Sequence, residues 1–152
     1  MIQRIAYQAT DLARNHRKVL AEARAGYAVV RDKDGTTLIL TPAAEVEKLR
    51  ELSELALGLA TLQRVLARPV DQRPTALFGS LAWASALPED SQREFAEELA
   101  DALLVAGSGA SMEPVRELIT DWIATAEAWA DPETRERLLA DEPKPLGTAL
   151  DA

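Results

Sequence analysis

The chain has 152 residues and a formal net charge of −8, and its 47% hydrophobic and 28% charged residues are typical of a soluble globular protein. It has no cysteine, which excludes disulfides, thiolate metal sites and a cysteine nucleophile, and its one histidine, His16, excludes a histidine-rich metal cluster. There is no apolar leader and no run of about 18 apolar residues, so we expect a cytoplasmic protein with no membrane contact.

Charge divides unevenly between the two halves of the sequence. Residues 1–70 carry 11 Lys and Arg against 8 Asp and Glu, a net of +3, whereas residues 71–152 carry 6 against 17, a net of −11. Such asymmetry indicates an N-terminal part that binds an anion and a C-terminal part with another role. Two solvated faces of one globule are the alternative.

The first elements are a short strand and an amphipathic helix. Residues 2–7 alternate apolar and polar, which predicts the strand, and Thr10 or Asp11 offers an N-cap for a helix that Gly26 ends. At 100° per residue the helix has an apolar and a basic side. The apolar side holds Leu12, His16, Val19, Leu20 and Ala23, and the basic side holds Arg14, Arg17, Lys18, Ala21 and Arg24. We therefore expect His16 to be partly buried and hydrogen-bonded across a dimer or helix contact, with a pH-sensitive or DNA-contacting role as the alternative.

A hairpin and a long helix follow. Two β-rich runs within residues 27–41 flank Asp34-Gly35, a pair that favours a tight turn. Thr41 and Pro42 read as N-cap and first residue of a helix that runs towards residue 68. Whether Gly58 bends that helix is left open by the sequence.

The remainder of the sequence has purely helical periodicity. Residues 70–74 are the expected linker, and GSGAS at 107–111 is an expected break between helices. The predicted organisation is a domain at 1–69, an acidic helical partner-binding region at 75–141 and a flexible tail at 142–152. We expect the fold class to be α+β, with an all-α C-terminal region.

Catalytic and metal-binding patterns are weak. Glu97, Glu98 and Asp101 share one helix, and Glu113, Glu117 and Asp121 share another, a spacing that can bind metals in helical bundles. They lack accompanying histidines and suit exposed helix faces. The GSGAS segment is not followed by GK[ST] and is no phosphate loop. We expect no enzyme activity, no catalytic residue, no metal and no cofactor.

The order strand, basic helix, hairpin, helix over residues 3–66 resembles the DNA-binding part of Phd/YefM-type antitoxins. The resemblance is carried by the opening strand, the Ala13-Arg14-Asn15 core with Val19-Leu20 after it, the Ala25-Gly26 helix end, the hairpin glycine Gly35, and Pro42 before an acidic-leading helix. It covers roughly 60 residues. It implies a β-α-β-β-α dimerisation and DNA-binding domain.

Three departures from the family pattern bear on DNA binding. The family usually has A-R-x-N-L, whereas this chain has L-A-R-N-H, so Arg14 directly precedes Asn15 and His16 stands where a core leucine is expected. In the hairpin, Asp32 and Asp34 dilute the basic turn common in relatives. Weaker affinity or altered geometry on DNA would follow.

The resemblance implies a homodimer whose first helices enter the major groove of a palindromic operator. Arg14 and Asn15 lie in the first turns, where Arg reads guanine and Asn reads adenine. The other expected contacts are to phosphate. The full expected DNA-binding set is Thr10, Arg14, Asn15, Arg17, Lys18, Arg24, Arg31 and Lys33, with Arg4 a weaker candidate.

The acidic second half would then neutralise a cognate toxin, as in a type II toxin–antitoxin system in which the dimer represses its own operator. The toxin is expected to be basic. Whether the dimer forms a higher oligomer with the toxin is left open. The expected partner contacts are Phe95, Leu99, Trp122 and Trp129. The alternatives are an orphan transcriptional regulator or interaction adaptor without a toxin, and a small-molecule sensor with a pocket at Trp83, Trp122 and Trp129.

Overall fold

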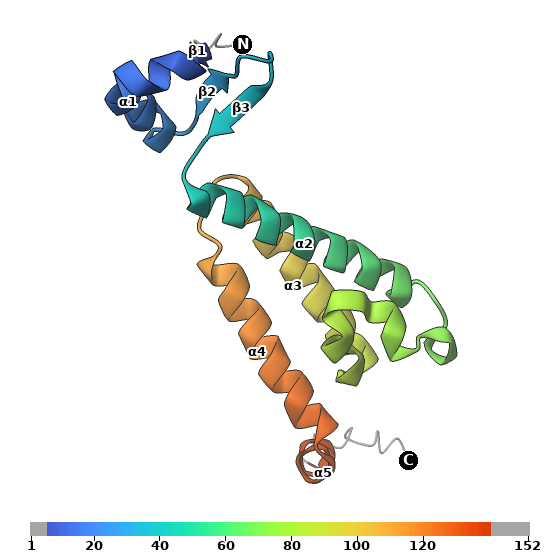
Figure 1. Ribbon diagram of the computed structural model, residues 1–152. Coiled ribbons are helices and arrows are strands. Elements are labelled where there is room, and N and C mark those ends of the chain that lie inside the picture. Colours follow the sequence, from blue (N-terminus) through green and yellow to red (C-terminus); the bar gives the residue numbers. More distant parts are fainter. Residues whose placement is uncertain (1–5, 141–152) are drawn as a thin grey trace, which may run out of the picture. The chain divides into compact units, whose positions relative to one another are not determined.

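The structure is a computed structural model that describes residues 6–140 (Figure 1). Its elements in chain order are β1 (Ala6–Gln8), α1 (Ala9–Arg24), β2 (Ala28–Arg31), β3 (Thr37–Leu40), α2 (Ala43–Leu66), the 3-10 segments η1 (Val70–Gln72) and η2 (Thr75–Ala86), α3 (Glu89–Gly107), α4 (Glu113–Ala130) and α5 (Pro132–Ala140). Helices account for 75% of the described residues, so the chain is mostly helical.

The expected fold class, α+β with a Phd/YefM-type N-terminal domain, is wrong. The strands are only three or four residues long and form one small three-stranded sheet, while every other described element is helical. The turn glycines Gly26 and Gly35 marked breaks between elements correctly. They do not determine how much of the molecule is sheet, because strand length depends on the packing surface that the rest of the fold supplies.

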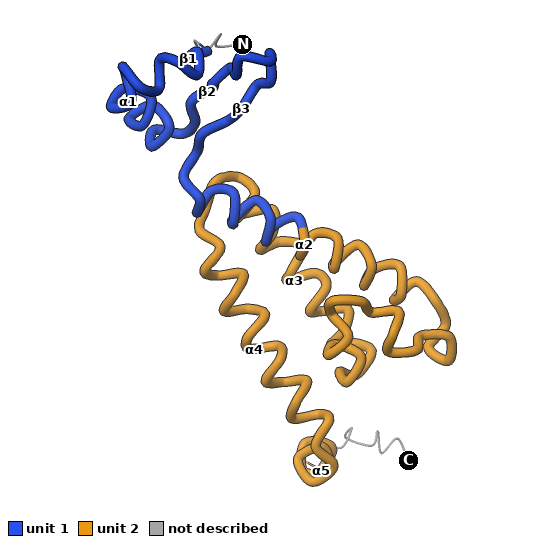
Figure 2. The backbone as a smooth tube through the Cα atoms, viewed as in Figure 1, with its two compact units in different colours: residues 1–53 blue, residues 54–152 orange. Residues whose placement is uncertain are grey.

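Two compact units make up the chain, residues 1–53 and residues 54–152 (Figure 2). The division falls inside α2, whereas the sequence suggested residues 70–74 as a linker. Within that segment Val70–Gln72 forms a 3-10 turn, and the side chain of Arg73 is tightly held, as described below. The N-terminal unit therefore consists of the sheet, α1 and the first turns of α2.

In the N-terminal unit, one helix covers one face of the sheet. β1 pairs with β2 in parallel and β2 pairs with β3 antiparallel, so the strand order is β1-β2-β3. Tyr7 pairs in register with Val30, and both face α1, which contributes Val19 and Ala23 to the core. Ala28 completes this small buried cluster.

The two turns of this unit follow the sequence signals with one change. The hairpin prediction is confirmed: Gly35 has φ of 89°, and the Asp32 amide donates to the Thr36 carbonyl at 2.8 Å. The cap prediction at Thr41 is wrong. The Thr41 hydroxyl donates to the carbonyl of Gly26 at 2.8 Å, and α2 starts at Ala43.

α1 begins earlier than expected and contains a kink. Gln8 is its N-cap, in place of Thr10 or Asp11, and its backbone N–H donates to the Asp11 carboxylate at 3.0 Å. Asn15 has φ of −120° and ψ of 24°, which are not helical values. His16 is exposed and not partly buried as expected, because the buried side of α1 begins only at Val19, three residues later.

The C-terminal unit has an aromatic and aliphatic core of its own. Phe95 is fully buried, with the ring of Trp83 at 4.9 Å on one side and that of Trp122 at 5.7 Å on the other. These separations are those of interacting aromatic pairs. Leu62 and Leu99 are also fully buried, so α2, η2, α3 and α4 all contribute to this core.

Within the part of the sequence that has helical periodicity, η2 (Thr75–Ala86) is an irregular 3-10 stretch and not a regular helix. Gly79 has φ of 58° and ψ of −127°, and Leu81 is also outside helical values, so the segment turns twice. Phe78, Leu81 and Ala84 are buried. The segment has no polar side to turn towards water, so a regular amphipathic helix offers it no advantage, and its backbone instead follows the shape of the core. Across residues 6–140, no helix combines the length and apolarity that crossing a membrane requires.

Candidate nucleic-acid interface

The acidic residues of α1 are both engaged in local structure. The Asp11 carboxylate accepts the backbone N–H of Gln8, and the Glu22 carboxylate accepts the hydroxyl of Tyr7 at 2.6 Å. Hydrogen bonding to that carboxylate raises the pKa of Tyr7 above its usual value of 10.0, and desolvation adds to the rise. Both acids of the helix therefore fix its position relative to β1.

The four cations of α1 differ from its two acids, which are engaged in local hydrogen bonds. Arg14, Arg17, Lys18 and Arg24 are all exposed, and among residues 6–140 none of them forms an ion pair. Arg17 and Arg24 are seven residues apart and so share one side of the helix, turned away from the buried Val19 and Ala23. The sequence-based expectation of a basic outer surface on this helix is confirmed.

The remaining expected DNA contacts are exposed but lie on different elements. Thr10 is in the first turn of α1, Arg31 ends β2, and Lys33 lies in the hairpin turn, where its backbone N–H donates to Asp32. The Asp34 carboxylate accepts the Thr36 amide at 2.8 Å, which lowers its pKa, so it stays ionised beside the hairpin cations. Arg4 lies outside the described residues.

Arg14 and Asn15 lie at the kink of α1, which the sequence did not indicate. Because Asn15 leaves helical geometry, Arg14 ends one helical segment and the residues after Asn15 begin another. Asparagine tolerates such a position better than most residues because its side chain bonds locally to the backbone. Both side chains are exposed, as base contacts require.

The face of the sheet opposite α1 is apolar and partly exposed. Val29 pairs with Ile39 across β2 and β3, and these residues alternate with Ala28 and Val30, which face α1. Ile39 is 65% exposed and Val29 is half-buried. No described element of the N-terminal unit covers this face in the single chain.

The expected partner contacts in the C-terminal unit are mostly core residues. Phe95 and Leu99 are fully buried, so they cannot form a contact surface on the folded unit. Trp122 is half-buried, and its indole N–H donates to the Glu98 carboxylate at 2.7 Å. Trp129 is half-buried on α4. Large apolar side chains at helical spacing more often mark the side of a helix that faces the core than a side that binds a partner.

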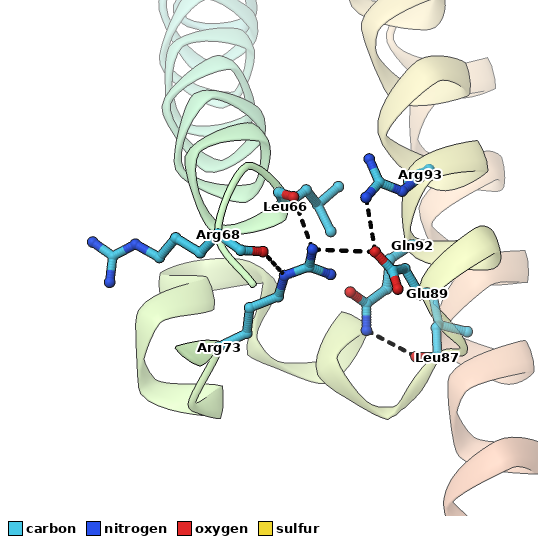
Figure 3. Close-up of polar contacts among 7 residues, drawn as sticks. All are labelled: Leu66, Arg68, Arg73, Leu87, Glu89, Gln92 and Arg93. Atoms are coloured by element: carbon cyan, nitrogen blue, oxygen red, sulfur yellow. Dashed lines mark hydrogen bonds and ion pairs between the residues drawn. The ribbon is translucent and has the colours of Figure 1, made fainter. Parts of the chain in front are cut away.

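A buried arginine organises the junction between α2 and α3 (Figure 3). The Arg73 guanidinium donates to the carbonyls of Leu66 and Arg68 at the C-terminal end of α2, at 2.9 and 2.7 Å. It also pairs with Glu89 in the first turn of α3 at 3.1 Å, and its side chain is only 7% exposed. One side chain thus satisfies free carbonyls of one helix and holds the start of the next.

Glu89 is shared between two arginines. Arg93, one turn further along α3, donates to the same carboxylate oxygen at 2.7 Å. The hydrogen bond from Arg93, followed by that from Arg73, lowers the pKa of Glu89 below its ordinary value of 4.5. The carboxylate is therefore held ionised. No sequence pattern indicated this cluster, since Arg73 lies in the segment expected to be a linker.

A groove runs between the last turns of α2 and the middle of α3, with a volume of about 610 Å³. Its lining residues are Gln63, Leu66, Ala67, Arg93, Ala96, Glu97, Ala100 and Asp101. Among the described residues, no group of three or more His, Asp or Glu side chains has an arrangement that could hold a metal ion. The lining combines small and apolar side chains with the charged side chains of Arg93, Glu97 and Asp101.

Comparisons with known proteins place only the C-terminal half. Residues 80–149 match a family described as a family of unknown function, DUF6247. No curated protein and no solved structure matches the chain. The Phd/YefM family is absent from the matches as well. The matched residues contain α3, α4 and α5, so the family covers the acidic helical part and not the basic helix.

Proposed function

We propose that the protein binds operator DNA through α1 and the β2–β3 hairpin, as the antitoxin and autorepressor of a type II toxin–antitoxin pair. Because operator DNA would be its ligand, we expect the protein to act in the cytoplasm. The C-terminal helical unit, of which the structure describes residues 54–140, binds the toxin in this proposal. The function rests on the sequence resemblance together with the charge arrangement of the N-terminal unit.

One observation carries the DNA part of the proposal. All four cations of α1 face outward without partners among the described residues, while its two acids, Asp11 and Glu22, are occupied by Gln8 and Tyr7. An ordinary solvated helix of mixed charge would pair its acids and bases on its own surface. Here the acids are removed from that surface and the bases remain free for phosphate.

A dimer is needed for useful affinity. One N-terminal unit offers only a few phosphate contacts, and affinity for DNA rises with the number of phosphates neutralised. Two copies double that number and match the symmetry of a palindromic site. The exposed apolar face around Val29 and Ile39 is the surface that we propose the two copies share.

The test uses the DNA upstream of the gene and the neighbouring small open reading frame. We expect the wild type to retard the upstream fragment, and Arg14→Ala with Lys18→Ala to abolish retardation. We also expect co-expression of the wild type to restore growth to cells that express the neighbouring product. No retardation by the wild type would overturn the DNA claim, and no restored growth would overturn the antitoxin claim.

An adaptor or orphan regulator without a toxin is the second candidate. It is favoured by the independent core around Phe95 in the C-terminal unit, because antitoxin segments of the resembled family commonly fold only on their toxin. Retention of DNA binding without growth rescue by any neighbouring product separates this candidate from the antitoxin.

A further inference from the structure

The groove between α2 and α3 has a floor of small and buried side chains. Leu66 and Ala96 are buried and Ala100 is half-buried, and the exposed Ala67, just after the end of α2, adds a fourth small or apolar residue. Helix axes pack 8–10 Å apart depending on the side chains at the contact, so an alanine floor lets another helix approach closely. All of these residues belong to the C-terminal unit.

The floor continues along α3 into an unpartnered leucine. Ala96, Ala100 and Leu104 are spaced by four residues, so they follow one side of the helix. Leu104 is 74% exposed, and its neighbour Val105 is 59% exposed. From Arg93 to Leu104 this side of α3 extends about 18 Å, which is long for a small-molecule pocket and suits a helix in a groove.

The rim of the groove on α3 is acidic. Glu97 and Asp101 line it, both are exposed, and neither forms an ion pair among the described residues. Glu94 lies on the same flank, one turn before Glu97 and Glu98. The one cation of the lining, Arg93, pairs with Glu89 at 2.7 Å, a carboxylate that it shares with Arg73. A partner with basic residues beside an apolar stripe would complement this rim.

We infer that the α2–α3 groove binds a basic amphipathic helix of a partner protein, its apolar stripe on Ala96, Ala100 and Leu104 and its cations on Glu97 and Asp101. The inference rests on the proposed function in one respect, because the toxin is the partner that would supply the helix. The groove takes the place of Phe95 and Leu99, which are buried, as the partner surface.

The test uses the full chain and two synthetic peptides of about 16 residues. One has leucines along one helical stripe with flanking lysines, and the other has glutamates in place of the lysines. We expect the lysine peptide to bind, measured by fluorescence anisotropy, with affinity that falls as salt rises. The glutamate peptide should bind at least about tenfold more weakly, equivalent to 1.4 kcal/mol.

Variants localise the binding to the groove. Ala100→Trp fills the floor, and Glu97→Lys with Asp101→Lys reverses the rim; each should weaken the lysine peptide at least about tenfold. The matched controls lie on α4: Ala124→Trp adds the same bulk at an exposed alanine, and Glu117→Lys with Asp121→Lys reverses an exposed pair of the same spacing. These controls should leave the affinity unchanged, and circular dichroism should show all four variants folded.

Three results would overturn the inference: no binding of the lysine peptide by the wild type, equal loss in the α4 controls, or no loss in the folded groove variants. A fourth is dissociation of a homodimer by Ala100→Trp in sedimentation, which would make the occupant a second copy of this chain. DNA retardation and growth rescue are scored separately on the same variants. Growth rescue that survives Ala100→Trp would reject the groove and leave the antitoxin function standing.

Discussion

Gly58 lies where α2 meets the 3-10 segment η2. A Cβ at this position would lie 3.0 Å from Ser80 Oγ and 3.4 Å from the Leu81 side chain. The glycine is therefore a point of close approach inside the helix Ala43–Leu66 and does not mark an end of it. The sequence left its role open because a glycine in a helical pattern fits both a bend and a close contact.

Gly58→Val should destabilise the protein by ~1–3 kcal/mol, since the added atoms overpack the contact with η2. Ala56→Val is the control, because Ala56 is exposed on the same helix and reports only the small propensity cost of a β-branched residue. Urea unfolding of both variants gives the comparison. Equal loss in the two would show that the contact at Gly58 contributes nothing.

Phe95 is the centre of the aromatic core, between Trp83 and Trp122. Phe95→Ala should cost ~3–5 kcal/mol through lost burial and the remaining cavity. Tryptophan emission should also shift to longer wavelength, because water reaches both indoles. A loss below about 1 kcal/mol would contradict full burial of this ring.

His16 and Phe95 show which residue-level properties the sequence predicted. Phe95 and Leu99 were expected as partner contacts, but both are fully buried in the folded unit. His16 was expected to be partly buried because it shares the apolar side with Val19 and Ala23, yet it is exposed. Apolar periodicity indicates which side of a helix faces the core, but it does not show how far along the helix the core extends or whether a buried side chain faces a partner.

At the scale of elements, the Arg73–Glu89–Arg93 cluster links the end of α2 to the start of α3 (Figure 3). Because the pKa of Glu89 is lowered in the folded chain, its pairing stabilises the fold above the ordinary pKa of 4.5. That contribution is lost as the pH falls from 4.5 through the lower folded pKa, where the carboxylate becomes protonated.

We therefore expect Glu89→Gln to melt at a lower temperature than the wild type at neutral pH, with the difference shrinking as the pH falls below about 4.5. Glu94→Gln, an exposed neighbour with no hydrogen bond or ion pair among the described residues, should show almost no difference at any pH. Thermal melts followed by circular dichroism provide the measurement. A wild-type advantage that stays constant down to about pH 3 would contradict the lowered pKa.

Turn positions were well predicted where short-range chemistry determines them, since Gly26 follows the end of α1 and Gly35 forms the hairpin turn. The expected N-caps were wrong, because Gln8 caps α1 and α2 starts at Ala43. The groove between α2 and α3 could not be predicted, because it depends on Arg73 joining helices whose facing residues are more than twenty positions apart in the sequence. The short strands likewise gave no measure of the helical share of the fold.

Across the whole chain, charge separates with the two units. The cations of α1 belong to the N-terminal unit, and the acidic rim at Glu97 and Asp101 belongs to the C-terminal unit. DNA would be attracted to the first and repelled by the second, and a basic protein the reverse. The proposed DNA surface and the proposed partner surface both rest on this separation of charge.

A second double variant, with the same net charge as the α1 variant, is the control for the DNA claim. Arg14→Ala with Lys18→Ala removes two cations from α1, and Arg64→Ala with Arg135→Ala removes two exposed cations from the C-terminal unit. Both double variants therefore have the same net charge. Only a specific role of α1 would make their affinities for DNA differ.

The most direct measurement is the salt dependence of binding to the upstream DNA, by fluorescence anisotropy of the wild type and these two double variants. We expect Arg14→Ala with Lys18→Ala to bind at least about tenfold more weakly and to flatten the slope of log affinity against log salt by about 1 per chain, because Lys18 is the phosphate contact of the pair. The Arg64→Ala and Arg135→Ala control should keep the wild-type slope. Identical slopes and affinities for all three proteins would contradict α1 as the DNA-binding surface.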